Sequence, residues 1–477
     1  MNASPPLRLP TDPAGATGQL AQWLADLDLA DLPDQALTRA KHLILDGVAC
    51  ALVGAQLPWS RLATEAITKL EGEGSGSLIG WGRKLPPTSA ALLNGAYIQA
   101  FELDDYHFLA PIHSNAVVLP ALFAAAQQKD GVTGAELLRG AIAGYEVGPR
   151  VGMALHGLQM LSRGWHSGAV FGTHAAAAAA GIVYRLDAAG FEDALGMAGT
   201  QSGGLMAAQF EAMVKRMHHG FSSRNGLYAA ALAASGYTGI KRVFERDYGG
   251  FLSTFGEGHS PDASKITEGL GSVWECARIS VKPYAAMTGH HAAIQGILEL
   301  REQHGFRADH VEKLDIYLGH AAFHHGWWDA KRPLTATGAQ MFIGYSAAVA
   351  VLDGAAMMAQ YTPSRIDSDD VWEMISRIEA HHDASVDSKP RQEQLATRLE
   401  IKLRDGAVLR AEIPEPPGFH SNPMPNEAVV AKFHALTGGL IEEGRRKAIA
   451  QMILDLESLD DAGALLDLLE RPAHALF

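Results

Sequence analysis

The feature that most constrains the fold is a long stretch, residues 87–244, built largely from Ala, Leu and Gly. Apolar residues recur there at the spacing of a helix face, and turn signals separate the helical windows. Small side chains let neighbouring helices approach closely, so this stretch predicts a compact helical bundle. The helical windows lie at 89–101, 116–128, 134–154, 169–184, 191–197 and 225–235.

The pattern of apolar and polar residues changes after about residue 278. Residues 310–319 alternate like a strand, and residues 396–413 form two alternating runs around Asp405-Gly406, a strong hairpin signal. Helical patterns at 339–360 and 369–378 lie between them.

A Pro-rich linker follows at 414–425, and helical periodicity then returns from 426 onwards. We therefore predict a mainly α fold. A large all-helical domain (1–278 and 416–477) is interrupted near the C-terminus by a smaller α+β lid domain (279–415). A crevice between two domains is the expected place for a site.

The charge balance restricts the class of partner. The chain carries a formal net charge of -14 and has no basic run, so we expect no binding to nucleic acid or to an anionic membrane surface. An anionic substrate would need positive charge gathered locally in a pocket. The two cysteines, Cys50 and Cys276, suit a reducing compartment and cannot hold an iron–sulfur cluster. With no signal-peptide pattern and no apolar run long enough for a bilayer, we predict a cytoplasmic protein.

The first chemically promising segment is FELDDYHFLAPIHSN, residues 101–115. Three carboxylates (Glu102, Asp104 and Asp105) precede two imidazoles, His107 and His113. Carboxylates this close repel, which raises their pKa unless cations or donors compensate. A solvated turn is the plain alternative, but the apolar neighbours argue against full exposure.

The second segment, RGWHSGAVFGTH, places His166 just before an Ala-rich helix, where backbone N–H groups can meet an anion. A capping turn is the alternative, and His174 is better explained as a core histidine. In the third segment, MVKRMHHGFSSRN, Lys215 precedes His218 and His219 at spacings that share a helix face, and Gly220 is expected to end the turn. Neighbouring cations there would lower the pKa of the lysine.

The fourth segment, SVKPYAAMTGHH, falls at the predicted domain boundary. Lys282 before Pro283 lies on an extended segment, from which domain closure can deliver it. Tyr284, His290 and His291 follow. An ordinary linker is the alternative.

Other motifs carry less weight. The pair His324-His325 beside two tryptophans fits packing better than a site. Metal ligation by Asp104, His107 and His113 has a spacing that matches no common site. Metalloprotease, nucleotide-loop and serine-nucleophile motifs are missing from the sequence, and a Gly-rich stretch at 72–82 lacks a dinucleotide fingerprint. His, Lys and carboxylate side chains must therefore carry the chemistry.

These segments, in their order and spacing, resemble the MmgE/PrpD family. Its members include 2-methylcitrate dehydratase, cis-aconitate decarboxylase and iminodisuccinate epimerase. The resemblance implies a helical domain with an inserted lid, usually in a homodimer. It extends over most of the chain and includes LILDGVACALVGA, ALLNGAYIQAFELDD, HSNAVVLPAL, GAIAGYEVGPRVG, FGTHAAAAAAG, GTQSGGLMAAQFEAMVKRMHHGFSSRNG and SVKPYAAM.

The resemblance also implies a pocket between helical domain and lid that removes or delivers a proton next to a carboxylate of a small polycarboxylate. No cofactor and no metal are expected. The predicted catalytic residues are His113, His166, Lys215 and Lys282. Lysines would stabilise the enolate-like anion, and a tuned imidazole or lysine would act as acid or base. The predicted substrate-binding residues are Asp104, Asp105, Tyr106, His107, His218, Tyr284 and His291.

Some positions depart from the decarboxylase type. Tyr106 stands where that type has Thr, Ser114 replaces a common Pro, and Met287 replaces a His. Residues 330–333 also lack its Tyr and Asn. These differences weaken the case for cis-aconitate as substrate and say little about what replaces it. We predict first a 2-methylcitrate dehydratase-like elimination. The alternatives are an iminodisuccinate-like epimerase and a cis-aconitate-like decarboxylase. The alternatives from other functional classes are a non-catalytic helical binding protein and a metal-dependent hydrolase.

Overall fold

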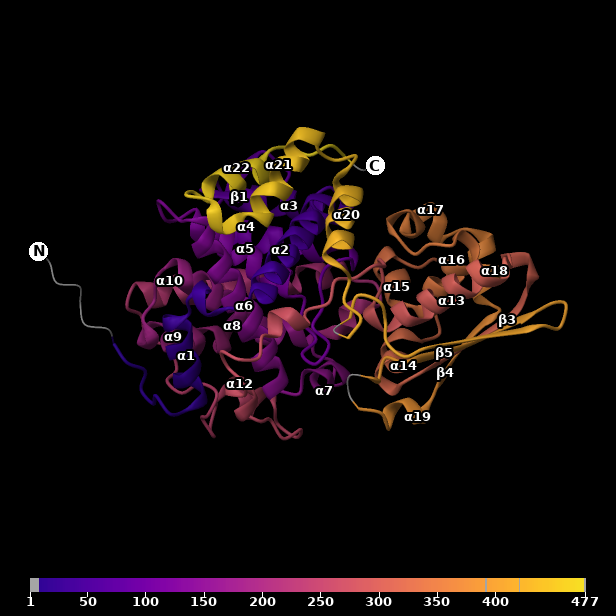
Figure 1. Cartoon of the computed structure of the whole chain (residues 1–477), viewed down its shortest axis with the longest axis horizontal. Helices are drawn as coiled ribbons and strands as arrows, with labels where there is room; N and C mark the ends of the chain where they lie inside the picture. Colours follow the sequence, from indigo (N-terminus) through magenta and orange to yellow (C-terminus); the bar gives the residue numbers. More distant parts are fainter. Residues whose placement is uncertain (1–7, 391–392, 420, 476–477) are drawn as a thin grey trace, which may run out of the picture.

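The computed structural model describes residues 8–390, 393–419 and 421–475, and it has two lobes of unequal size (Figure 1). The larger lobe is helical, as predicted, and the last three helices fold back onto it. Its helices are α1 (Ala16–Asp26), α2 (Asp34–Gly54), α3 (Pro58–Leu70), α4 (Pro87–Ile98), α5 (Ser114–Ala126), α6 (Gly134–Ala154), α7 (Gly157–Ser162), α8 (Ser167–Val183), α9 (Ala188–Ala198), α10 (His218–Ala234), α11 (Phe251–Phe255), α12 (Ser264–Thr267), α20 (Asn426–Thr437), α21 (Glu443–Leu454) and α22 (Gly463–Glu470).

Small residues set the close packing at the centre of this lobe. All residues of α8 are buried, and the helix packs against α5, α6 and α10. A Cβ on Gly220 would lie 2.2 Å from the backbone oxygen of Leu92, so only glycine lets α10 approach α4 this closely. Gly220 therefore does not end a turn, as the sequence suggested. It lies inside α10, which begins at His218 rather than near 225.

The smaller lobe contains a four-stranded sheet in the order β4-β3-β5-β6. Strand β3 (Val311–Leu318) runs antiparallel to β5 (Thr397–Leu403) and parallel to β4 (Ile378–His382). The hairpin of β5 and β6 (Val408–Ile413) forms where the Asp-Gly signal predicted it. Gly406 adopts φ 92°, a left-handed conformation that suits glycine.

The lid helices differ from the predicted ones in one respect. The window 339–360 contains two helices, α15 (Ala336–Met341) and α16 (Ile343–Asp353), because the chain is extended at Phe342. Gly354, at φ 68°, ends α16. The remaining helices are α13 (His291–His304), α14 (His320–Gly326), α17 (Pro363–Ile366), α18 (Asp369–Ile375) and α19 (Ala384–Asp387). The exact limits of the lid, 279 and 415, stay a prediction.

Helix α20 ties the end of the chain to the loop after α4. Nζ of Lys432 lies 2.7 Å from Oδ1 of Asp46 on α2 and donates a hydrogen bond of 2.6 Å to the backbone oxygen of Leu103. A short hairpin of β1 (Gly76–Leu78) and β2 (Arg83–Leu85) packs beside α22. Among the described residues, no single helix has the length and apolarity of a membrane span; α2 and α3 would meet that test only as a pair bent by 82°.

Candidate active site

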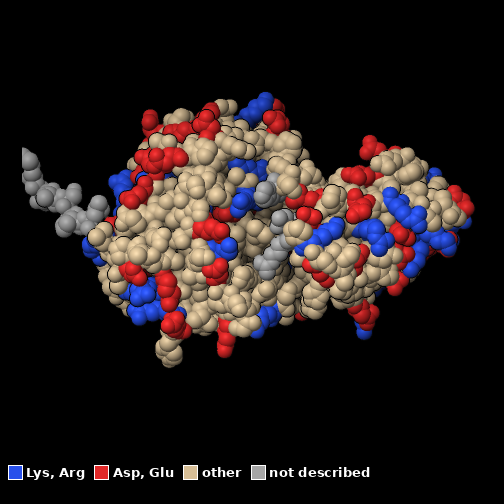
Figure 2. Space-filling model, turned by 60° about the horizontal axis from the view of Figure 1, so that its bottom comes forward, with Lys and Arg blue, Asp and Glu red and all other residues tan. Residues whose placement is uncertain are grey.

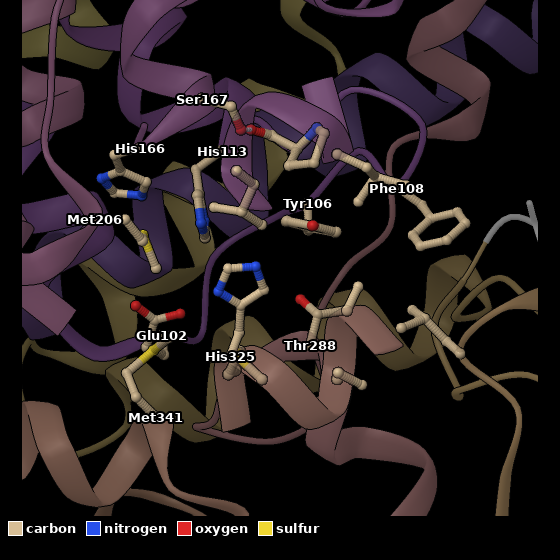
Figure 3. Close-up of a pocket in the computed structure, with 18 of the residues that line it drawn as sticks. Glu102, Tyr106, Phe108, His113, His166, Ser167, Met206, Thr288, His325 and Met341 are labelled. Carbon is tan, nitrogen blue, oxygen red and sulfur yellow. Dashed lines mark hydrogen bonds between the residues drawn. The ribbon is translucent and has the colours of Figure 1, made fainter. Parts of the chain in front are cut away.

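A cavity lies where the two lobes meet (Figure 3). Its empty space is about 800 Å³ with the open mouth included. This is the crevice in which the sequence predicted a site. The larger lobe contributes Glu102, Tyr106, Phe108, Pro111, His113, Leu158, Leu161, His166, Ser167, Met206 and Lys215 to its wall. The segment at the lobe boundary and the lid contribute Lys282, Met287, Thr288, Gly289, Ala321, Ala322, His325, Met341, Gln394 and Leu395.

Glu102 is the electrostatic centre of the cavity wall. Its carboxylate accepts hydrogen bonds from the Lys215 ammonium, from Arg216 at 2.9 Å and from Lys282 at 2.9 Å. Burial would raise the pKa of Glu102, but these cations hold it well below the usual range. Its backbone is left-handed, at φ 54° and ψ 30°. Three cations therefore share one carboxylate.

The two lysines reach Glu102 from different elements. Lys215 lies in a 3-10 turn, Met213–Met217, immediately before α10, and Lys282 follows a backbone bridge between Ser280 and Tyr106. Burial lowers the pKa of Lys215; Glu102 opposes this shift and Arg216 adds to it. This agrees with the predicted lowering by neighbouring cations, although the larger cause is burial.

Positive charge is thus gathered inside an acidic protein. On the face shown in Figure 2, basic and acidic side chains are interspersed. Lys215, Arg216 and Lys282 each expose 3% or less of their side chains. The positive charge that an anionic substrate requires is therefore concentrated around the cavity and hidden from the surface.

Two imidazoles on the cavity wall stand at helix N-termini. His113 directly precedes α5, and its Nδ1 lies 2.9 Å from Oδ2 of Asp104. His166 directly precedes α8, and its Nδ1 lies 2.8 Å from Nδ1 of His218. Burial lowers the pKa of His166 well below 6.5, and the charges of His219 and Lys215 add to this effect. His166 is therefore neutral at physiological pH.

The acidic pair of the first segment stands behind the wall. Asp105 accepts the backbone N–H groups of Ser114 at 2.7 Å and Asn115 at 2.9 Å, so it caps α5 and fixes the His113 turn. Asp104 lies close to His113, and its predicted role of orienting an imidazole stays a prediction. The carboxylate of Glu275 lies 3.1 Å from Nε2 of His107. The backbone N–H of Ala110 donates to Nδ1 of His107 at 3.2 Å.

Other predicted residues lie away from the cavity wall that the described residues form. The Tyr284 hydroxyl donates to Gln295 at 2.5 Å, and burial raises its pKa to about 12. Nε2 of His291 lies 3.0 Å from the backbone oxygen of Ala286. His218 stands behind His166. The predicted substrate-binding set is therefore split, with Tyr106 on the wall and the others in a supporting layer or farther off.

Three residues were missed as members of the site. Glu102 was noticed among the acids but passed over for Asp104 and Asp105, because sequence does not show which carboxylate the distant lysines reach. Arg216 stood beside Lys215 in a basic run that carried no signal of its own. His325 brings an imidazole into the cavity from α14, although its sequence context favoured packing.

Three histidines at and behind the cavity wall could be considered as ligands of a metal. His113, His166 and His219 each offer a ring nitrogen, and these atoms lie within 4.8 Å of one another. Imidazole suits divalent transition metals, but the adjacent Lys215 and Arg216 would repel a dication. The set named from sequence is less suitable, because both ring nitrogens of His107 are already engaged. The absence of a metal and of a cofactor stays a prediction.

Comparison with known proteins identifies the class. The MmgE/PrpD N-terminal domain model matches residues 18–264, and the MmgE/PrpD C-terminal domain model matches residues 284–458. The chain therefore belongs to the MmgE/PrpD family, as its sequence motifs indicated, and it is an enzyme of the lyase or isomerase type found there.

The chain is similar over its whole length to several characterised relatives. It is 42% identical to a cis-aconitate decarboxylase-like protein of Aspergillus oryzae, over 96% of this chain and 98% of that protein. It is 38% identical to the cis-aconitate decarboxylase of Aspergillus terreus, over 97% of both chains. Identity to the cis-aconitate decarboxylase of mouse is 25%, over 96% of this chain and 94% of the mouse protein. These relatives favour the decarboxylase alternative over the elimination that the sequence placed first.

Proposed function

We propose that the protein decarboxylates a cis-aconitate-like tricarboxylate without metal or organic cofactor. The observation that carries this proposal is the buried group of Lys215, Arg216 and Lys282 around Glu102, with His113 and His166 on the same cavity wall. The similarity over nearly the whole chain to the cis-aconitate decarboxylase of Aspergillus terreus and to a cis-aconitate decarboxylase-like protein of Aspergillus oryzae supports the choice of reaction.

The charge arrangement suits a polyanion. Three cations with one carboxylate leave uncompensated positive charge at the wall, and a low-dielectric cavity strengthens its attraction for substrate carboxylates. Lys215 and Lys282 are on the wall and would hold two of those carboxylates. Since they are fixed before substrate enters, they stabilise the anion that forms in the transition state without reorganisation.

The reaction itself requires one proton from the enzyme. When the carbon–carboxylate bond breaks, its electron pair stays on the substrate carbon and carbon dioxide leaves. A proton must then be added, so a trianion and one proton give a dianion and carbon dioxide. His113 and His166 are wall imidazoles from the same lobe as Lys215, and we assign proton delivery to them.

Elimination of water from a 2-methylcitrate-like acid is the second candidate. One observation favours it: Met287, where the decarboxylase type has a histidine, lines the cavity and removes a polar group there. Elimination takes up no net proton and releases no carbon dioxide, so the two reactions are distinguishable by their products.

The test is nuclear magnetic resonance of the enzyme in D2O with chelator present and a panel of acids: cis-aconitate, 2-methylcitrate, citrate, malate and an amino-dicarboxylate. We expect carbon dioxide from cis-aconitate and one deuterium on the shortened product. A new alkene without carbon dioxide would establish elimination instead, and an inverted stereocentre would establish epimerisation. Activity lost with chelator and restored by a divalent metal would overturn the metal-free proposal.

We also propose the homodimer that the family resemblance implies. Large apolar side chains are exposed along the segment before α10 and on α10 itself, and water-exposed groupings of this kind mark contact surfaces. A double substitution, Tyr228→Glu with Leu232→Glu, should give a monomer of 50.8 kDa in sedimentation, whereas Tyr248→Glu should not. A wild-type chain that sediments as a monomer would reject the proposal. The exposed residues are Leu205, Phe210, Met213, Val214, Tyr228, Leu232 and Tyr237.

A further inference from the structure

His166 and His218 form a directly hydrogen-bonded pair of imidazoles. Their Nδ1 atoms lie 2.8 Å apart, and their ring centroids are 5.1 Å apart at an interplanar angle of 64°. His166 belongs to the cavity wall, whereas His218 stands behind it, on the first turn of α10. The two rings therefore connect the cavity wall to the residues that stand behind it.

A hydrogen bond between two Nδ1 atoms restricts the protons of both rings. A neutral imidazole carries one N–H, and one partner must donate while the other accepts. When Nδ1 of His218 holds the shared proton, His166 must carry its own proton on Nε2. When Nδ1 of His166 holds it, His218 carries its proton on Nε2. The two rings thus always adopt opposite tautomers while both are neutral.

Both rings are neutral in the resting protein. Burial, with a smaller contribution from the charge of Lys215, lowers the pKa of His218 to about 4. The pKa of His166 is well below its ordinary value for the same main reason. A neutral His166 that gave its Nε2 proton to a carbanion would become an imidazolate unless a second proton reached its Nδ1. His218 is placed to supply that proton.

We propose that His218 is a positioning residue that relays a proton to His166 during turnover, rather than a residue that binds substrate. The proposal deepens the decarboxylase function proposed above and rests on it. It also replaces the role that the sequence suggested for His218.

The relay is balanced in protons and bonds. The Nε2–H bond of His166 breaks as the new C–H bond forms on the substrate. The Nδ1–H bond of His218 breaks as an Nδ1–H bond forms on His166. Water or hydronium outside the cavity gives a proton to Nε2 of His218. Both rings end neutral with exchanged tautomers, and one proton has passed from solvent to the substrate carbon.

The surroundings allow this route. His218 retains 7% of its surface exposed, so it is not sealed from solvent. Gly204 covers the pair: a Cβ there would lie 3.3 Å from Cβ of His166 and 3.6 Å from Nδ1 of His218. After product release, water in the cavity can return a proton to Nε2 of His166. The Nδ1–H bond of His166 then breaks as an Nδ1–H bond forms on His218, and His218 loses its Nε2 proton to solvent, which restores the first tautomers.

The kinetic test uses His218→Asn, which keeps a hydrogen-bond donor and acceptor but cannot pass a proton through a ring. We expect kcat on cis-aconitate to fall about 100-fold, within the range of general acid catalysis, with KM changed less than twofold. The matched control is His174→Asn, which removes another buried imidazole from α8. It should retain kcat at a temperature where circular dichroism shows it folded.

The dependence of kcat on the fraction of D2O separates a relay from a structural role. The wild type should give a curved plot, because more than one proton moves in the same step, and His218→Asn should give a straight one. A raised KM with unchanged kcat would show that His218 binds substrate and would overturn the relay. Straight plots for both proteins would overturn it as well.

A second measurement needs no substrate. In the resting enzyme with 15N-labelled histidine, we expect His166 and His218 to be neutral and in opposite tautomers, with the assignment made by the His218→Asn variant. If no acid of the panel reacts but the opposite tautomers are present, the proposed function fails while the paired imidazoles stand. Identical tautomers in the two rings would overturn the relay whatever the substrate. If His218→Asn does not fold, His218→Gln replaces it in both tests.

Discussion

Glu102 shows how a single residue can set the charge of a whole site. A non-glycine residue in the left-handed region is disfavoured by about 1–2 kcal/mol. The three charge-assisted hydrogen bonds to Lys215, Arg216 and Lys282 offset that cost and fix both wall lysines. Glu102 therefore holds in place, before substrate arrives, the cations that the proposed reaction uses.

Glu102→Gln should destabilise the empty enzyme, because it leaves three buried cations without a carboxylate. The loss expected on removing one partner of a buried ion group is about 3–5 kcal/mol. Added tricarboxylate should restore more of the melting temperature in this variant than in the wild type, since it supplies the missing negative charge. Calorimetry with and without cis-aconitate measures both effects. Glu102→Asp is the control, and equal melting temperatures for Glu102→Gln and wild type would contradict the role given to Glu102.

Lys215→Ala and Lys282→Ala should each lower kcat/KM by about 100-fold or more, as the loss of one preorganised donor does elsewhere. The fold should persist, because Glu102 keeps two cationic partners in either variant. Initial rates on cis-aconitate check the expectation. Lys331→Ala, whose side chain is 84% exposed on the lid, is the matched control. Full activity in both lysine variants would remove the basis of the mechanism.

At the scale of residues, the sequence predicted which side chains lie at the site better than it predicted the contacts between them. His113, His166, Lys215 and Lys282 were named from local patterns, and the structure brings all four to one cavity. Their catalytic roles stay a prediction. Local patterns could not show that Lys282 pairs with a carboxylate 180 residues earlier. Tyr284 and His291 sat in an equally suggestive segment, yet folding turned them toward Gln295 and a backbone carbonyl.

At the scale of elements, helices and hairpins followed their sequence signals where packing and local preference agree. The alternating pattern was sufficient to predict β3, and the Asp-Gly turn was sufficient to predict the hairpin of β5 and β6. Strand β4 was missed, because its five residues (IEAHH) alternate too briefly and it pairs with β3 only after a crossover. The start of α10 was missed because Gly220 was taken for a terminator, whereas tertiary contact with α4 requires glycine within the helix.

Gly220→Ala tests that contact. The added Cβ would lie 2.2 Å from a backbone oxygen of α4, which cannot yield as a flexible side chain would. We expect a loss of about 1–3 kcal/mol in the free energy of unfolding, as in other overpacked interiors. Gly444→Ala is the control, because a Cβ there meets nothing within 4 Å. Urea denaturation compares the two, and equal midpoints for Gly220→Ala and wild type would show that α10 can shift at no cost.

Across the whole molecule, buried neutral histidines make stability depend on pH. Burial lowers the pKa of His174, His290 and His291 to about 3, below the value of about 6.5 expected in the unfolded chain. As the pH falls, each of these histidines binds a proton in the unfolded chain before it does so in the folded protein. The stability it contributes is therefore full above pH 6.5 and is lost as the pH falls toward 3.

We therefore expect the free energy of unfolding to fall between pH 6.5 and pH 4 by about 1 kcal/mol per pH unit for each of these histidines. Urea midpoints at pH 8, 6.5 and 5 measure the slope. His174→Asn should flatten it, since one titrating group is removed. A midpoint that stays constant between pH 6.5 and pH 5 would show that these imidazoles do not remain neutral in the fold.

The two walls of the cavity come from different parts of the chain, and this has a consequence for how such enzymes diversify. The charged wall, with Glu102, His113, His166 and Lys215, belongs to the helical lobe. The other lobe contributes Met287, Thr288, His325 and Met341. Ancestral changes confined to that second wall could retune the shape and polarity offered to an acid while the inherited proton chemistry stayed intact. Exchanging lid segments between relatives is therefore a better route to a new substrate than mutating the helical lobe.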